Sequence, residues 1–309
     1  MDEYAYLLSR RRGLSDLNRL AQDMLECNDT RPEGWVCLAL YHQKKNFTST
    51  NSPTSSSNEK PLHFIDRALR LDVRHAFAHR VRGMLLLAES QPAEAVTSFH
   101  YANQIQKDVA NYEGLVEAYI VQGNKHKEAV CMAKEAMNIA PKDPRTFTLI
   151  GLALSHSPQT SEGGKEKAKR AFRKALLVDP YALRPMFALA DMYLDEEDYA
   201  SAMDLLVKAA QGHGRPDEQD MIHSKLADVY TMMEQYSDAL GHYHTAISIN
   251  SENVEAQRGL ERLERLMRGL PEGDESQQNV HGDDQMSPEA PDQGAGTQTN
   301  FEQDHIGYL

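Results

Sequence analysis

Cysteine is scarce in this sequence: only Cys27, Cys37 and Cys131 occur in 309 residues, and no two of them have CxxC spacing. This scarcity excludes a disulfide framework and a zinc knuckle, and it favours a reducing compartment. Long apolar runs are also missing, because no window approaches the roughly 18 uninterrupted apolar residues of a membrane-spanning helix. The first residues place an acidic pair ahead of the arginines, the reverse of a secretory signal peptide. We therefore expect a soluble intracellular chain.

Basic side chains are outnumbered, with 33 Lys and Arg against 46 Asp and Glu and a formal net charge of -13. Such a chain repels nucleic-acid phosphate, and the short run from Arg10 to Arg12 does not overcome that repulsion. No glycine-rich phosphate loop occurs, and no Ser, Cys or Thr stands in a recognisable activating context. We expect no enzyme activity, no cofactor, no nucleic-acid partner and no membrane association.

Histidine spacing offers one metal candidate. His75 and His79 are four residues apart, so a helix would place both imidazoles on one face. No glutamate follows the first His and no third ligand is specified, so the sequence favours two ordinary histidines near the start of a helix. His242 and His244 flank Tyr243 and point to different faces of a helix, which excludes joint ligation by these two. We expect no metal.

A repeated spacing of small and bulky residues governs the chain. In residues 220–253, Leu226-Ala227-x-x-Tyr230 is followed by Ala239, Tyr243 and Ala246, and residues 183–216 and 76–108 keep the same spacing. Small residues allow two antiparallel helices to approach closely, and bulky ones fill the gaps between them. The residues that carry this signature are Trp35, Ala39, Ala68, Gly83, Ala95, Phe99, Ala102, Tyr112, Tyr119, Ala129, Ala136, Gly151, Ala168, Phe172, Ala175, Ala190, Tyr193, Ala202, Ala209, Ala227, Tyr230, Ala239, Tyr243 and Ala246.

The pattern predicts an all-α solenoid, a right-handed superhelix of helix pairs, over residues 1–268. Seven repeats are expected, followed by a capping helix, and they span 1–31, 32–75, 76–108, 109–143, 144–182, 183–219 and 220–253, with the cap at 254–268. A flexible Ser/Thr-rich insertion at 47–59 and a disordered acidic tail at 269–309 complete the predicted organisation. Ser-Pro pairs begin at Ser52, Ser157 and Ser287, where either phosphorylation or a bland linker would fit.

The first helix of each predicted pair should line a groove that faces a partner. Its second, fifth, ninth and twelfth positions supply a mixed apolar and acidic lining, which favours a protein surface as partner or, for the apolar members, contact with the neighbouring repeat. A clamp for a peptide carboxylate would need Asn at the ninth position, and no repeat has one. The candidate groove residues are Val36, Leu40, Arg80, Met84, Glu113, Glu117, Leu152, Arg184, Asp191 and Asp228.

The spacing resembles that of the tetratricopeptide repeat across roughly residues 3–267. Repeat order and several stretches, including YLLSRRRGLSDLNRL, EKAKRAFRKALLVDP and YSDALGHYHTAISI, are similar to the C-terminal half of the family of anaphase-promoting complex (cyclosome) subunit 7. Tyr6, Leu7 and Leu8 match that family's opening Tyr-Leu-Leu, Trp35 matches its early Trp, and Tyr112–Glu117 matches its Tyr-Glu-Gly-Leu-x-Glu run.

This resemblance implies a non-catalytic scaffold subunit of a cullin-RING ubiquitin ligase that controls mitotic progression, with other tetratricopeptide subunits as partners and residence in nucleus and cytoplasm. Met1 falls near the start of a middle repeat, so the family's N-terminal, dimer-forming repeats are absent, which puts homodimerisation in doubt. The chain is then either truncated or a shortened homologue, and the apolar stack end at Tyr4, Leu7 and Leu8 favours truncation or a covering partner. The alternative is a generic adaptor or co-chaperone that binds peptide motifs of another complex.

Overall fold

A computed structural model describes residues 2–10, 14–48, 60–157, 162–211 and 218–269. These residues form fifteen α-helices and no strand, so the prediction of an all-α fold is confirmed. The helices are α1 (Asp2–Arg10), α2 (Leu14–Cys27), α3 (Pro32–Thr48), α4 (Pro61–Leu71), α5 (Ala76–Ala88), α6 (Pro92–Ile105), α7 (Val109–Gln122), α8 (His126–Ile139), α9 (Pro144–Ser155), α10 (Glu162–Val178), α11 (Leu183–Leu194), α12 (Tyr199–Gln211), α13 (Gln219–Met232), α14 (Tyr236–Ile249) and α15 (Val254–Met267).

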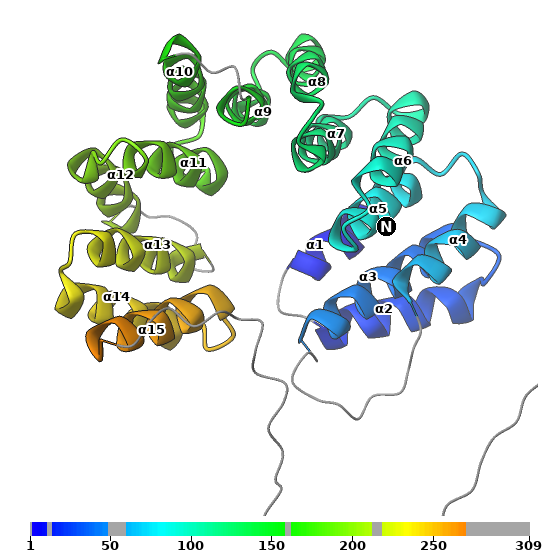
Figure 1. Cartoon of the computed structure of the whole chain (residues 1–309). Helices are drawn as coiled ribbons and strands as arrows, with labels where there is room; N and C mark the ends of the chain where they lie inside the picture. Colours follow the sequence, from blue (N-terminus) through cyan, green and yellow to red (C-terminus); the bar gives the residue numbers. More distant parts are fainter. Residues whose placement is uncertain (1, 11–13, 49–59, 158–161, 212–217, 270–309) are drawn as a thin grey trace, which may run out of the picture. The chain divides into compact units, whose positions relative to one another are not determined.

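The helices follow one another in pairs, because each odd-numbered helix up to α13 contacts the even-numbered one that follows it, as Figure 1 shows for α5 with α6 and for α13 with α14. Each odd-numbered helix from α1 to α9 also contacts the next odd-numbered helix. We call the odd-numbered helices the first helices and the even-numbered ones the second helices. Contacts between successive first helices are typical of helix-pair repeats, in which each unit buries its apolar face against its neighbours. By its internal contacts the chain divides into Met1–Glu264 and Arg265–Leu309.

Local sequence explains where the helices begin. Pro61, Pro92 and Pro144 are the first residues of α4, α6 and α9, where the missing N–H costs no hydrogen bond. Asp108 and Asp143 precede α7 and α9 and accept hydrogen bonds from the backbone N–H groups two residues on, which satisfies one of the free donors at each helix start.

The turns inside the pairs use the left-handed backbone region. Gly123, between α7 and α8, has φ of 72°, a conformation that glycine adopts without steric cost. In three other pairs the corresponding turn contains Ser90, Glu197 or Glu234 with φ of 59–61°, so those turns tolerate a side chain in a less favourable conformation.

Close packing depends on aromatic rings that lie against glycine. Phe172 of α10 lies against Gly151 of α9, and Tyr243 of α14 lies against Gly259 of α15; a Cβ on either glycine would come within 2.4 Å of the ring. α15 also contributes Ala256 and Leu263 to the core that α13 and α14 form. Of the signature residues, all are buried except the half-buried Trp35, Tyr193 and Tyr230.

The structure differs from the predicted boundaries at two places. α3 continues through Phe47 and Thr48, which the sequence assigned to the insertion at 47–59, because the helix pattern of residues 32–46 carries no breaker at its end. α13 begins at Gln219, one residue before the predicted repeat start. Residues 49–59 and 270–309, with Ser52 and Ser287, lie outside the described residues.

Candidate protein-interaction surface

Ion pairs connect the first helices to one another. The Arg80 guanidinium of α5 donates to the carboxylate of Asp108, the residue before α7, at 2.8 Å. Arg184 of α11 donates to Glu117 of α7 at 3.2 Å, and Lys225 of α13 pairs with Asp191 of α11 at 2.5 Å. We call the surface that carries these pairs, on α5, α7, α9, α11 and α13, the first-helix face. Its charged side chains are held by neighbours within the chain.

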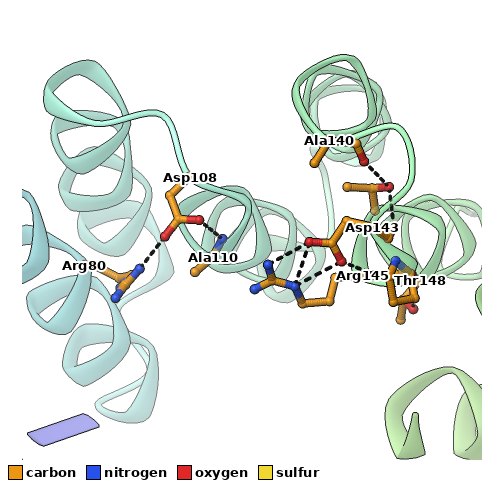
Figure 2. A network of polar contacts seen from close by, with 9 residues as sticks. Arg80, Asp108, Ala110, Ala140, Asp143, Arg145 and Thr148 are labelled. Atoms are coloured by element: carbon orange, nitrogen blue, oxygen red, sulfur yellow. Dashed lines mark hydrogen bonds and ion pairs between the residues drawn. The ribbon is translucent and has the colours of Figure 1, made fainter. Parts of the chain in front are cut away.

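Arg145 of α9 sits in the middle of this face. Its guanidinium donates to the Asp143 carboxylate at 2.7 Å, and Figure 2 shows the arginine pointing from α9 toward the start of α7, near Ala110. Burial opposes the charge of Asp143, but the hydrogen bonds from Arg145 outweigh burial and lower the pKa of that carboxyl. The same hydrogen bond, which Arg145 donates to Asp143, raises the pKa of Arg145 together with the nearby charges of Asp143, Glu113 and Asp108.

All lysines and arginines of these five helices are paired with a carboxylate. Arg82 of α5 completes the set, because it lies 3.5 Å from Asp66 of α4. A site that captures a peptide's terminal carboxylate needs cations that are free to donate to it. The first-helix face has none, since each cation already has an acidic partner.

Eight of the ten predicted groove residues divide into three groups. Glu117, Arg184 and Asp191 are exposed, Arg80, Glu113 and Asp228 are half-buried, and Met84 and Leu152 are half-buried with part of each side chain packed against a core. Asp228 accepts a hydrogen bond from the Tyr243 hydroxyl at 2.6 Å, and burial together with that carboxylate raises the pKa of Tyr243.

Val36 and Leu40 contradict the groove prediction. Their exposed fractions are 0% and 2%, and they belong to a core that also contains Ala5 of α1 and Phe77 of α5. α3 contacts both α1 and α5, so the two neighbouring first helices cover the positions that were expected to face a partner. These two residues are therefore core, as the weighed alternative of contact with the neighbouring repeat proposed.

Five residues of the first-helix face were not among those predicted from the sequence: Arg82, Asp108, Asp143, Arg145 and Lys225. A signal was present for the two aspartates, because each stands directly before a first helix, where an N-cap is expected. No pattern within a single repeat indicates that Lys225 pairs with Asp191 on the preceding first helix.

The histidines have local partners. His75 Nδ1 accepts a hydrogen bond from the backbone N–H of Ala78 at 3.0 Å, and His79 Nε2 lies 2.9 Å from the carbonyl oxygen of Val73. Each of the two imidazoles therefore meets a backbone group of its own neighbourhood. Among the described residues, no group of three or more His, Cys, Asp or Glu side chains is arranged to hold a metal ion. None of the described helices has the length and apolar character needed to cross a membrane.

A contact between two histidines, His223 of α13 and His242 of α14, was also not predicted from the sequence. Their Nδ1 atoms are 3.0 Å apart and their rings stack, and the Tyr230 ring also stacks with that of His242. Burial lowers the pKa of both histidines. The signal lay in the repeat positions, since residues 223 and 242 face each other across one helix pair.

The sequence is 33% identical over 270 residues to anaphase-promoting complex subunit 7 of Arabidopsis thaliana, a match that covers 87% of this chain and 45% of that relative. The chain thus spans less than half the relative's length. No protein-family model matches.

Two solved structures share the fold. The anaphase-promoting complex hetero-tetramer Cut9-Hcn1 superimposes with a TM-score of 0.58 at 17% identity, over 85% of this chain and 48% of that chain. A thermophilic tetratricopeptide-repeat protein of Thermus thermophilus gives a TM-score of 0.51 at 19% identity, over 61% of this chain and 98% of its own.

Proposed function

Because the chain is a tetratricopeptide-repeat protein whose sequence resembles part of anaphase-promoting complex subunit 7, we propose that it serves as a non-catalytic scaffold subunit of that ubiquitin ligase. Its seven proposed repeats would hold other tetratricopeptide subunits in place, while ubiquitin transfer would belong to other subunits. The similarity over 87% of the chain is the observation that carries this proposal. Residence in nucleus and cytoplasm is part of the same proposal.

The first-helix face supports a scaffold better than a peptide receptor. Its cations are neutralised by Asp108, Asp143, Glu117, Asp191 and, at the α4 side, Asp66, so a partner that docks there meets a surface with little free positive charge. Glu117 and Asp191 have half-exposed side chains, at 52% each. Paired, half-exposed charges are typical of the polar rim of a protein interface.

The alternative, an adaptor or co-chaperone that captures short peptides by their terminal carboxylate, finds less support. The cations such a site would use already donate to carboxylates, and breaking an existing pair would cost part of the binding energy. The paired cations therefore favour a face that docks on a protein subunit over one that binds the terminal carboxylate of a short peptide.

Affinity purification of the tagged full-length chain from dividing cells tests the proposal. Recovery of cullin, RING and other tetratricopeptide subunits is the expected result. The variant E117K/D191K should reduce that recovery, because it places two cations beside Arg184 and Lys225, whereas K107E, which changes an exposed lysine between α6 and α7, should not. Recovery of the chain with chaperones alone would contradict the proposal.

A further inference from the structure

The second helix α10 has an unusual excess of positive charge. It carries six cations, Lys165, Lys167, Lys169, Arg170, Arg173 and Lys174, against two acids, Glu162 and Glu166. The second helix α8 balances two lysines with two glutamates, and α12 balances one of each. The whole chain has a net charge of -13. α10 is therefore a positively charged helix in an acidic chain. A helix face needs no such excess of cations merely to be solvated.

One side of α10 is committed to the fold. Ala168, Phe172 and Ala175 are fully buried, and α10 packs against α9 and α11. Lys169 also turns inward, where its ammonium pairs with Glu196. These contacts fix the rotation of the helix and so determine which residues face outward.

The opposite side of α10 carries a straight exposed stripe. Lys167, Arg170, Lys174 and Leu177 are spaced by three, four and three residues, which places them on one line along the helix. All four are exposed, with 72% of the Arg170 side chain and 82% of Leu177 accessible. We call these four residues the α10 outer stripe.

Carboxylates of the described residues do not neutralise the positive charges of the stripe. Arg170 and Arg173 share the single carboxylate of Glu166, at 3.7 and 3.3 Å, and Arg173 also donates to the Tyr193 hydroxyl. Lys167 and Lys174 form no ion pair with any described residue. Two ammonium groups without an ion pair among the described residues thus flank Arg170, with an exposed leucine one turn beyond.

We infer that the α10 outer stripe is a docking surface for an acidic amphipathic helix of a partner protein. The stripe runs about 15 Å, since its ten-residue span rises about 1.5 Å per residue. A partner helix with Glu or Asp at i, i+3 or i+4, and i+7 would present carboxylates at the matching spacing. An apolar residue one turn further would cover Leu177, which lies beside the exposed Val178. The inference concerns a different surface from the proposed function and does not depend on it.

A protein helix fits this surface better than nucleic acid. The apolar end at Leu177 and Val178 offers nothing to a phosphate backbone, and the net charge of -13 opposes the approach of a polyanion at longer range. A single acidic helix brings only a few carboxylates and supplies an apolar contact as well, which matches what the stripe presents.

Fluorescence anisotropy with the purified full chain tests this inference. The probe is a labelled 17-residue peptide with Glu at positions 3, 6 and 10 and Leu at 13, and a scrambled peptide of equal composition is its control. The variant K167Q/R170Q/K174Q should weaken probe binding by about tenfold, as expected for the loss of three exposed ion pairs. L177A should weaken it by a smaller factor and leave its salt dependence unchanged.

A matched variant distinguishes the stripe from charge in general. K107Q/K134Q/K142Q removes three exposed lysines elsewhere and should leave probe binding unchanged. Equal binding of the scrambled peptide, or equal loss in both triple variants, would overturn the inference in favour of unspecific charge attraction. Tighter, stripe-dependent binding of a single-stranded oligonucleotide would overturn it in favour of nucleic acid.

Two further outcomes concern the occupant. Stripe-dependent dimerisation in analytical ultracentrifugation would assign the surface to a second copy of the chain and overturn the inference. Zero-length carbodiimide cross-linking of the full chain would do the same if Lys167 and Lys174 were joined to carboxylates of its own residues 270–309. In the full chain purified together with whatever proteins it binds, we expect both lysines to be joined to acidic residues of one partner helix at spacings of three or four.

Discussion

A Cβ atom on Gly114 of α7 would stand 2.2 Å from Cε1 of the Phe99 ring of α6. The other edge of the same ring lies against Gly83 of α5, where a Cβ would come within 2.7 Å of Cε2. Phe99 has an exposed fraction of 1%. This one side chain therefore fills the space between its own helix, α6, and the two successive first helices α5 and α7. Contact between these two repeats therefore depends on the absence of a side chain at residue 114.

Gly114→Ala should lower the free energy of unfolding by about 1–3 kcal/mol, because the new methyl overpacks a filled core. Gly241→Ala is the matched control: Gly241 is exposed within α14 and has no atom within 4 Å of its would-be Cβ. That change should raise the free energy of unfolding by roughly 0.5–1 kcal/mol through helix propensity alone. Urea unfolding followed by circular dichroism measures both; a neutral or stabilising Gly114→Ala would show that α7 can move away from the ring.

Packing within a repeat could be predicted from the sequence, and packing between repeats could not. Gly83 and Phe99 belong to one repeat and were singled out by their spacing, whereas Gly114 was not, because its contact with Phe99 crosses into the next repeat. The burial of Val36 and Leu40 has the same origin, since α1 and α5 cover them from both sides.

Ion pairs between residues far apart in the sequence could not be predicted either. Glu117 and Arg184 are separated by 67 positions, and they meet because α7 contacts α9 and α9 contacts α11. Repeat spacing predicts that two such helices share a face. It does not predict which side chains on that face reach one another, because this depends on the rotation of each helix about its axis.

The Glu117–Arg184 pair should contribute little to stability. Both side chains are about half-exposed, at 52% and 47%, and exposed pairs are typically worth about 0.2–1 kcal/mol. A double-mutant cycle with Glu117→Gln and Arg184→Gln, measured by urea unfolding, should give a coupling energy in that range that decreases in high salt.

Asp143→Ala should lower the free energy of unfolding by more than the loss of the Glu117–Arg184 pair does, by about 0.5–2 kcal/mol, because it also removes the N-cap of α9. If Asp143→Ala lowered the free energy of unfolding no more than the loss of the Glu117–Arg184 pair does, Asp143 would not act as the N-cap of α9.

Stability should fall in mildly acidic solution through the His223–His242 pair. Burial lowers the pKa of both imidazoles, with the charge of His242 acting further on His223 and Asp238 partly opposing the shift at His242. The unfolded chain, with ordinary pKa values near 6.5, then binds more protons than the folded one as the pH drops below about 6.5. The free energy of unfolding is therefore retained above this pH and lost below it.

Unfolding at pH 7.5 and pH 5.5 checks this sign. His242→Gln should reduce the loss of stability between the two pH values, since it removes one of the two shifted groups. His244→Gln changes the exposed neighbour on the same helix and should leave the loss as in the natural sequence. If both variants lost stability with pH as the natural sequence does, the acid sensitivity would come from other groups, among them His100, whose pKa burial also lowers.

The start of α15 should depend on Asn253 for two separate contacts. Its Oδ1 accepts from the backbone N–H of Ala256 at 3.0 Å, and its Nδ2 donates to the buried Asp220 carboxylate at 3.1 Å. Asn250 donates to the same oxygen of Asp220, while the other oxygen has no hydrogen-bond partner. Asn253→Ala should lower the free energy of unfolding by about 1–3 kcal/mol, because it removes a cap and a donor to a buried carboxylate.

Asn253→Asp separates these two contacts. The new carboxylate still accepts from Ala256, but it replaces the donor to Asp220 with a second negative charge at hydrogen-bond distance. We expect Asn253→Asp to be at least as destabilising as Asn253→Ala, and hydrogen exchange of the backbone amides from Ala256 to Leu260 to accelerate in both. If Asn253→Asp restored the stability of the natural sequence, capping alone would hold α15, and Asp220 would not require its amide donor at residue 253.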